Sequence, residues 1–155
     1  MRTQHIAKTA MRISRTSVHS QEKNVMNKEE IEEKLKRFPY CNNNYWLITG
    51  GAMVLYGLRE ETEDIDIGCT SELANELEIK GYLFQVMSDG NRWFKLSKDI
   101  EAFENWLYDT VVTIDGFPVI SLQGLREMKQ RLGREKDLRD IKLIDDYLTG
   151  TASER

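Results

Sequence analysis

Apolar side chains recur at helical spacing near the start of the regular part of the chain. Ile31, Leu35 and Phe38 stand at i, i+4 and i+7, which places them on one face of a helix. Asn27 is a suitable N-cap for this helix, and Pro39 ends it. The pattern therefore predicts an amphipathic helix that buries one side against the rest of the domain.

The next apolar segments are short and alternate between strand and helix. The run YWLIT predicts a strand that Gly50-Gly51 breaks, after which a helix starts at Ala52. Alternation in DIDIGC predicts the next strand, because every second residue is apolar. The segment Ser71–Ile79 predicts a helix capped by its own first serine.

Several strands and one helix are expected further along the chain. GYLFQVMS, NRWFKLS and IEAFENWLY predict strands, with SDGN as a hairpin turn between the first two, and TVVTIDGFPVIS predicts another hairpin. Ser121 caps the helix that follows, which buries Leu122, Leu125 and Met128 and ends at Gly133.

A second helix closes the pattern, with Leu138, Ile141, Ile144 and Leu148 as its apolar stripe. The order of elements, in which several strands stand between helices, predicts an α/β (α+β) domain. We expect a mixed sheet flanked by helices, with two helices at the C-terminal end.

Length and composition fit one globular domain. The chain has 155 residues, of which 40% are hydrophobic and 31% charged. No apolar run approaches the ~18 residues that a membrane-spanning helix needs. Cys41 and Cys69 form no CxxC pair, so we expect reduced thiols in a cytoplasmic protein.

Charge divides the chain into a basic leader and an acidic body. Residues 1–25 hold five of the 22 basic residues and one of the 26 acidic ones, so the rest carries 17 and 25. We expect a disordered leader, with an upstream extension before Met26 or a transit peptide as alternatives, and a folded domain over 26–150. Since both histidines also fall in the leader, chemistry in the body depends on carboxylates, amines, hydroxyls and bound ions.

Two carboxylates in the DIDIGC strand form the first candidate site. Asp64 and Asp66 project from one face of the strand, while Ile65 and Ile67 point into the core. Paired carboxylates repel unless a cation lies between them, and Mg²⁺ commonly binds one or two carboxylates together with substrate phosphates. The alternative is a solvated face of an edge strand. Gly50-Gly51 favours the site, because glycines before a helix let the backbone approach a phosphate.

The stretch TGGAMVLYG…TEDIDIG resembles the signature of the polymerase-beta-like nucleotidyltransferase superfamily. It is similar to the form in tRNA and antibiotic nucleotidyltransferases, and GREKDLRDIKLI resembles a helix of minimal AbiEii-type members. The resemblance covers roughly residues 43–148. It implies a nucleotidyltransferase fold and magnesium-dependent transfer of a nucleoside monophosphate from an NTP to a hydroxyl, with release of pyrophosphate.

The resemblance also implies a third carboxylate on a neighbouring strand. Glu101, after Ile100, is the first candidate, Asp99 the second and Asp109 the third. Glutamate stands where the family most often has aspartate. Asp64, Asp66 and Glu101 would then hold two Mg²⁺ ions, with Glu101 also acting as base.

Other residues are weaker candidates. Gly50-Gly51, Arg92 and Lys95 are expected to contact the nucleotide, although the two cations could equally be surface charges. Lys136 and Asp140 are spaced for an ordinary salt bridge within a helix, and Asp137 could orient the site. Three aromatic residues could stack on a base or belong to the core: Tyr45, Trp93 and Trp106.

Three functions remain open from the sequence. The first is a nucleotidyltransferase whose acceptor is a small molecule, an RNA end or a protein side chain. The second is a non-catalytic protein of the same fold that binds nucleotide or acts as a toxin–antitoxin-type partner. The third is a plain binding domain. The acidic body argues against broad binding to a nucleic-acid backbone.

Overall fold

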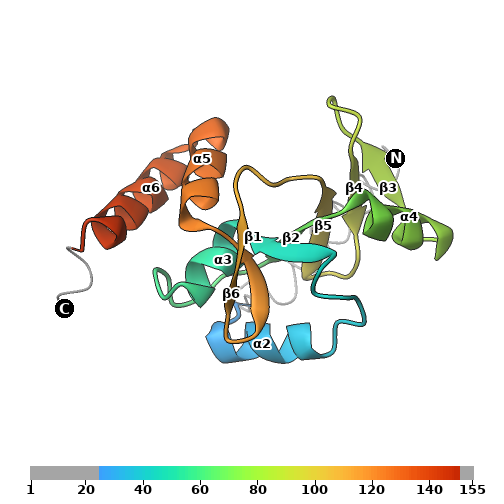
Figure 1. Ribbon diagram of the computed structural model, residues 1–155, viewed down its shortest axis with the longest axis horizontal. Coiled ribbons are helices and arrows are strands. Elements are labelled where there is room, and N and C mark those ends of the chain that lie inside the picture. Colours follow the sequence, from blue (N-terminus) through green and yellow to red (C-terminus); the bar gives the residue numbers. More distant parts are fainter. Residues whose placement is uncertain (1–24, 151–155) are drawn as a thin grey trace, which may run out of the picture.

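Seven strands form one mixed sheet in the computed structural model, which describes residues 25–150 (Figure 1). The strands are β1 (Tyr45–Ile48), β2 (Ile65–Cys69), β3 (Phe84–Val86), β4 (Arg92–Lys95), β5 (Ile100–Glu104), β6 (Val111–Ile114) and β7 (Phe117–Ile120). Their order across the sheet is β3-β4-β5-β2-β1-β7-β6. The expected leader, residues 1–25, lies outside the described residues except for Val25.

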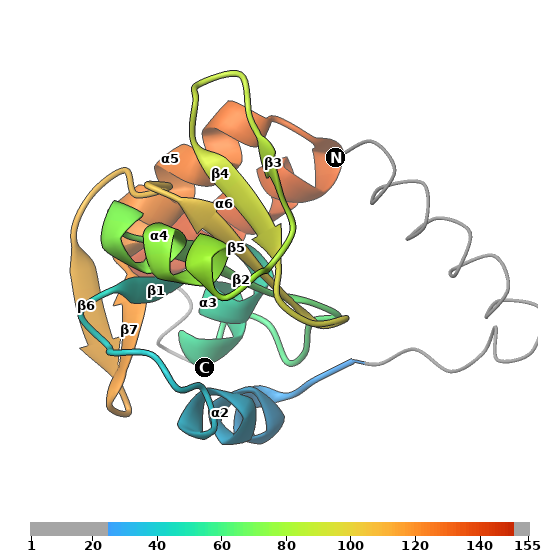
Figure 2. The ribbon, with the colours of Figure 1, turned by 90° about the vertical axis from the view of Figure 1, so that its right-hand side faces the viewer.

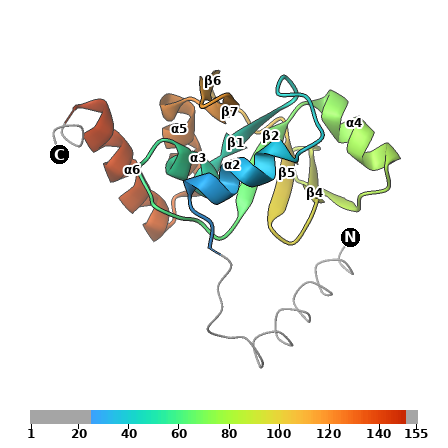
Figure 3. The same cartoon turned by 90° about the horizontal axis from the view of Figure 1, so that it is seen from below.

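Five helices accompany the sheet in the described part of the chain. They are α2 (Lys28–Lys36), α3 (Thr49–Leu55), α4 (Ser71–Ile79), α5 (Leu122–Leu132) and α6 (Glu135–Leu148). Figures 1 and 3 show α2 beneath the sheet, with the α5–α6 hairpin at one side of it. The expected architecture, a mixed sheet flanked by helices with two of them at the C-terminal end, is confirmed.

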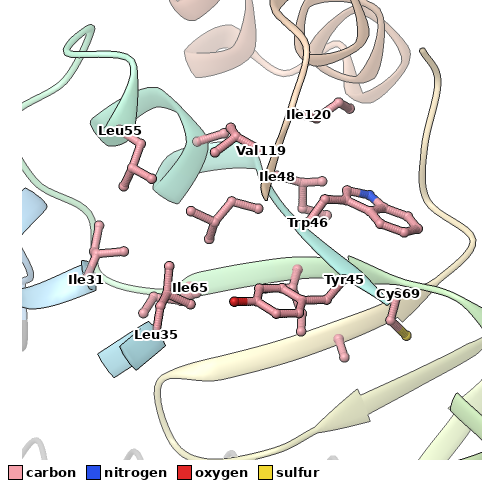
Figure 4. Close-up of a cluster of buried hydrophobic side chains, with 14 of the residues drawn as sticks. Ile31, Leu35, Tyr45, Trp46, Ile48, Leu55, Ile65, Cys69, Val119 and Ile120 are labelled. Carbon is pink, nitrogen blue, oxygen red and sulfur yellow. The ribbon is translucent and has the colours of Figure 1, made fainter. Parts of the chain in front are cut away.

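Strands β2, β1 and β5 form the centre of the sheet. β2 runs antiparallel to β1 and parallel to β5, and β7 runs parallel to β1 on its other side. Ile65 and Ile67 of β2 are fully buried, as the alternation predicts. Ile31 and Leu35 of α2 cover this face of the sheet (Figure 4).

Local signals set the ends of most elements. Asn27 caps α2 through a capping box with Glu30. The β6–β7 hairpin turns at Asp115 and Gly116, whose φ angles of 53° and 87° fit a tight turn of the predicted kind. The expected cap of α4 was wrong by one residue, since Thr70, with extended backbone, accepts the hydrogen bond from the Leu73 amide.

The predicted apolar stripe of α6 is confirmed at Ile144, which is fully buried, and is wrong at its two ends. Leu138 and Leu148 are 57% and 44% exposed, whereas Asp137 and Asp140 are buried beside Ile144. Consecutive helical residues are about 100° apart around the axis, so the buried face is turned by roughly one position from the expected one. None of the helices in residues 25–150 is both long and apolar enough to cross a bilayer.

Candidate active site

Three charged side chains stand in a row across neighbouring strands. Asp66 of β2 pairs with Glu101 of β5, and Glu101 pairs in turn with Lys95 of β4. Paired residues on adjacent strands project from the same face, with strands about 4.8 Å apart. Asp64, two residues before Asp66, precedes the first residue of β2. The strand register expected for Glu101 is therefore observed.

Thr49 holds the carboxylate of Asp66 from the end of β1. Its Oγ1 donates a hydrogen bond to Asp66 Oδ2 at 2.9 Å. Thr49 has a φ of 51°, an unusual conformation for a β-branched residue that costs roughly 1–3 kcal/mol. The surrounding sheet imposes this backbone, and the strained turn from β1 into α3 aims the hydroxyl at Asp66.

The electrostatics of the row centre on Asp66. Burial is the largest cause that raises the pKa of its carboxyl group, to about 6, and the charges of Glu101 and Asp64 raise it further. The hydrogen bond from Thr49 and the charge of Lys95 act in the opposite direction. Asp66 thus lies among negative charges that its neighbouring cation does not fully offset.

A cleft opens in front of Asp64 and Asp66. Its volume is about 690 Å³, within the ~300–1,000 Å³ typical of small-molecule sites. Residues from five segments of the chain line it: Val25, Thr49, Gly50, Arg59, Glu61, Thr62, Glu63, Asp64, Asp66, Phe103, Trp106, Lys129, Leu132, Arg134 and Lys136. The last four come from the α5–α6 hairpin, which lies behind the strands in the view of Figure 2.

Cations line the part of the cleft that the hairpin supplies. Arg134 donates hydrogen bonds to Asp137, which raise the pKa of the guanidinium, and Asp66 is among the smaller causes. Lys129 is buried between Asp137 and Asp140, at 3.6 and 2.8 Å. Asp137 and Asp140 offset two of the four cations on this part of the lining, which are Arg59, Lys129, Arg134 and Lys136. The remaining net positive charge suits a polyanion bound between these cations and the carboxylates.

The glycines begin α3 rather than precede it. The helix starts at Thr49, so Gly50 and Gly51 lie in its first turn, and only Gly50 lines the cleft. A Cβ atom at Gly50 would collide with the hydroxyl of Thr62, and one at Gly51 would come within 3.3 Å of Leu47. Close packing is thus sufficient to require glycine at position 50. The proposed phosphate contact stays a prediction.

Glu101 is held away from the cleft by two neighbours on β4. Its carboxylate accepts hydrogen bonds from Trp93 Nε1 at 3.0 Å and from Lys95 Nζ at 3.2 Å. Glu101 is not among the residues that line the cleft. A side-chain rotation that releases these bonds would be needed before Glu101 could reach a ligand beside Asp66.

The remaining candidates lie elsewhere. Arg92 binds Glu104 through two hydrogen bonds and Glu78 through a third, so the structure does not bring it to the cleft. Asp99 forms a salt bridge with Lys34 of α2 at 3.3 Å.

Two further candidate residues also lie away from the proposed site. Asp109 accepts a hydrogen bond from the Ser121 hydroxyl at 2.6 Å, at the start of α5. Tyr45 is buried against Phe38 in the core, away from Asp66 and Glu101.

The carboxylates fit a divalent cation only in part. Asp64 and Asp66 supply hard oxygen donors, and burial, with the charges of Glu101 and Asp64 as smaller causes, raises the pKa of Asp66, so a cation beside it would favour the ionised carboxylate. Within residues 25–150, however, no three acidic, histidine or cysteine side chains are grouped closely enough to hold a metal ion as they stand. Glu101 would complete such a group only after leaving Lys95 and Trp93.

Sequence reasoning missed several cleft residues. Thr49 carried the signal of a β-branched residue before Gly50-Gly51. Arg59, in the loop after α3, and Arg134, the N-cap of α6, carried none, because only tertiary packing brings them to the cleft. Asp140, expected to pair with Lys136, instead pairs with Lys129 and, at 3.6 Å, with Arg59. Lys136 lines the cleft.

Comparisons with known proteins give a distant likeness to a solved structure. The sequence matches no protein-family model and no curated protein. Among solved structures, the lincomycin-bound lincosamide antibiotic adenylyltransferase LnuA is similar over 74% of this chain and 92% of its own, at 19% identity and a TM-score of 0.46. At this distance the likeness transfers no activity and no residue roles to the present chain.

Proposed function

We propose that this protein transfers a nucleoside monophosphate from an NTP to a hydroxyl acceptor. In this reaction the acceptor oxygen forms a bond to the α-phosphorus, the bond between the α-phosphorus and the bridging oxygen to the β-phosphorus breaks, and pyrophosphate leaves. The observation that supports the proposal best is the cleft itself, in which Asp64 and Asp66 stand across from Arg59, Arg134 and Lys136. Carboxylates and cations arranged in this way suit a triphosphate carried by magnesium.

Asp64 and Asp66 are the residues proposed to hold Mg²⁺. When bound, the metal would neutralise charge on the phosphates as the leaving group departs. Thr49 would keep Asp66 in one orientation, because its hydroxyl already donates to Oδ2 in the free protein. Positioning and charge neutralisation would then supply most of the rate.

Glu101 is proposed to accept the proton of the attacking hydroxyl. It stands beside Asp66 on the next strand, and Lys95 at 3.2 Å would compensate its charge until the acceptor arrives. Lys95 is proposed to act on this carboxylate rather than on a phosphate, because its ammonium group already binds Glu101 and the carbonyl of Lys98.

A non-catalytic role is the second candidate. The hydrogen bonds from Trp93 and Lys95 hold Glu101 outside the cleft, while the carboxylates and cations that would bind a nucleotide face into it. A protein of this kind would bind Mg²⁺·NTP and not turn it over. Nucleotide binding is thus common to both proposals, and turnover separates them.

Two measurements test the proposals. Isothermal titration with Mg²⁺·ATP should detect binding to the wild-type protein, and Asp64→Asn or Asp66→Asn should abolish it without unfolding the domain. If both variants bind Mg²⁺·ATP as the wild type does, the proposed metal site is wrong.

Turnover is measured as pyrophosphate release from labelled NTPs, with pooled RNA, aminoglycosides and the protein itself as acceptors. Transfer to any of these supports the enzyme. Binding without release from any NTP and acceptor supports the non-catalytic role instead. Asp89→Asn, in the exposed turn between β3 and β4 and outside the cleft lining, is the control for loss of one carboxylate.

A further inference from the structure

Aromatic rings lie beside Asp66 and Glu101 on the same face of the sheet. Phe103 follows Glu101 by two residues on β5, so it projects from the same face about 7 Å further along the strand. Trp93 lies parallel to Phe103, with centroids 6.0 Å apart and planes 6° apart. Trp106 also stacks on Phe103, with centroids 4.8 Å apart and planes 23° apart. Three rings therefore form one stacked row.

One end of this row faces the cleft. Phe103 and Trp106 line it, and both are only partly buried by the protein. Leu132 of α5 lines the same cleft and is 37% exposed. The cleft thus has a charged part at Asp64 and Asp66 and an apolar part at Phe103, Trp106 and Leu132.

The position of Trp106 is fixed from beneath by Trp46. Trp46 Nε1 donates a hydrogen bond to the Trp106 carbonyl at 2.7 Å. The indole of Trp46 fits there because Gly68, which pairs with Phe103, has no side chain. A Cβ atom at Gly68 would collide with the Trp46 indole and lie 2.7 Å from the Trp106 carbonyl. The stacking surface is therefore built before any ligand arrives, which reduces the entropy lost on binding.

We infer that Trp106, with Phe103 stacked behind it, stacks on the nucleobase of the bound nucleotide. The inference rests on the proposed function, which places the phosphates at Asp66 and the cationic side of the cleft. The spacing of two residues along β5 is comparable to the reach of the ribose that separates phosphate from base. Because stacking uses the face that all bases share, this contact provides affinity with little discrimination between ATP and GTP.

The test compares two ligands that differ only in the nucleoside. The dissociation constants of Mg²⁺·ATP and Mg²⁺·tripolyphosphate are measured by titration calorimetry on the wild-type chain and on Trp106→Ala. We expect Trp106→Ala to weaken ATP at least tenfold and to leave tripolyphosphate within about twofold. Trp106→Phe should recover most of the ATP affinity. Tyr147→Ala, an exposed aromatic residue of α6 outside the cleft, should change neither constant.

Tryptophan fluorescence gives a second measurement that needs no variant. Saturating ATP or GTP should quench the emission of the wild-type protein, whereas tripolyphosphate should not. If ATP binds and neither the quench nor the loss in Trp106→Ala appears, the stacking inference is overturned while the proposed nucleotide site stands. If neither ligand binds the wild type, the proposed function and this inference fail together.

Discussion

Asp66 lies where the central sheet, the strained turn from β1 into α3 and the cleft meet. It is held by Thr49, stands beside Glu101 and faces the hairpin cations. A carboxylate in this position is unfavourable in the free protein, since burial and two like charges oppose its ionisation. Such a cost is typical of functional sites, where binding a ligand later offsets it.

The first prediction concerns the pH dependence of stability. The pKa of Asp66 rises from 3.8 to about 6 on folding, so the folded protein binds this proton more tightly than the unfolded chain. Its contribution to stability is fully present below about pH 4 and is lost as the pH rises through 6. In EDTA, Asp66→Asn should gain stability over the wild type across this window, by at most roughly 3 kcal/mol at pH 7.5.

Urea unfolding at several pH values measures this difference directly. Asn can still accept the hydrogen bond from Thr49, so the comparison isolates the charge. Glu29→Gln, on the exposed first turn of α2, is the control for loss of one carboxylate outside the site. A constant offset for Asp66→Asn would contradict the assigned cause.

The second prediction separates Glu101 from Asp99. Glu101→Ala should leave Mg²⁺·ATP binding largely intact and lower turnover by about 10²-fold or more, because it removes the proposed base. Asp99→Ala should do neither, since Asp99 is bound to Lys34 of α2. Steady-state kinetics and titration on both variants measure the split. Loss of turnover in Asp99→Ala with normal kinetics in Glu101→Ala would reverse the assignment.

At the scale of elements, the α5–α6 hairpin supplies cationic residues to the cleft, whereas β2 and the residues just before it supply the carboxylates Asp64 and Asp66. Lys129 is 3% exposed, Asp137 fully buried, and each is satisfied by partners across the two helices. Burial acts to raise the pKa of Asp137, but the hydrogen bonds from Arg134 and the charge of Lys129 outweigh it, so the pKa lies below its ordinary value. This network fixes Arg134 at the edge of the cleft.

The third prediction tests that network. Lys129→Met removes the shared cation and leaves two buried carboxylates short of a partner, which should cost about 3 kcal/mol or more. Lys142→Met, 79% exposed on α6, should change the unfolding free energy by no more than about 0.5 kcal/mol. Chemical denaturation at pH 7 measures both. Equal effects would show that the buried network contributes little.

The same hairpin shows which features the sequence could predict and which it could not. Periodicity identified β2, α2 and α5, and strand parity placed Glu101 beside Asp66, because these features depend on local spacing. The face of α6 could not be found in this way. Its buried positions, Asp137 and Asp140, are polar, and only their tertiary partner Lys129 makes that burial favourable. Arg59 and Arg134 were missed because only the tertiary packing of the chain brings them to the cleft.

At the scale of the whole molecule, the cleft lies between segments far apart in the sequence. Thr49, Asp64 and Asp66 approach from the sheet, and Lys129, Arg134 and Lys136 from the C-terminal hairpin. A ligand held by both parts would connect them. The unfolded chain has no such arrangement, so binding should stabilise the folded state.

The last prediction follows from this linkage. At 100 times its dissociation constant, Mg²⁺·ATP should add about 2.7 kcal/mol to the free energy of unfolding. For a chain of 155 residues this corresponds to a rise in Tm of about 5 to 10 °C. EDTA should abolish the rise, and so should Asp64→Asn, whereas Asp89→Asn should keep it. A Tm that rises equally with ATP in EDTA would show that the nucleotide binds without a metal. Asp64 and Asp66 would then not have the proposed role of holding Mg²⁺.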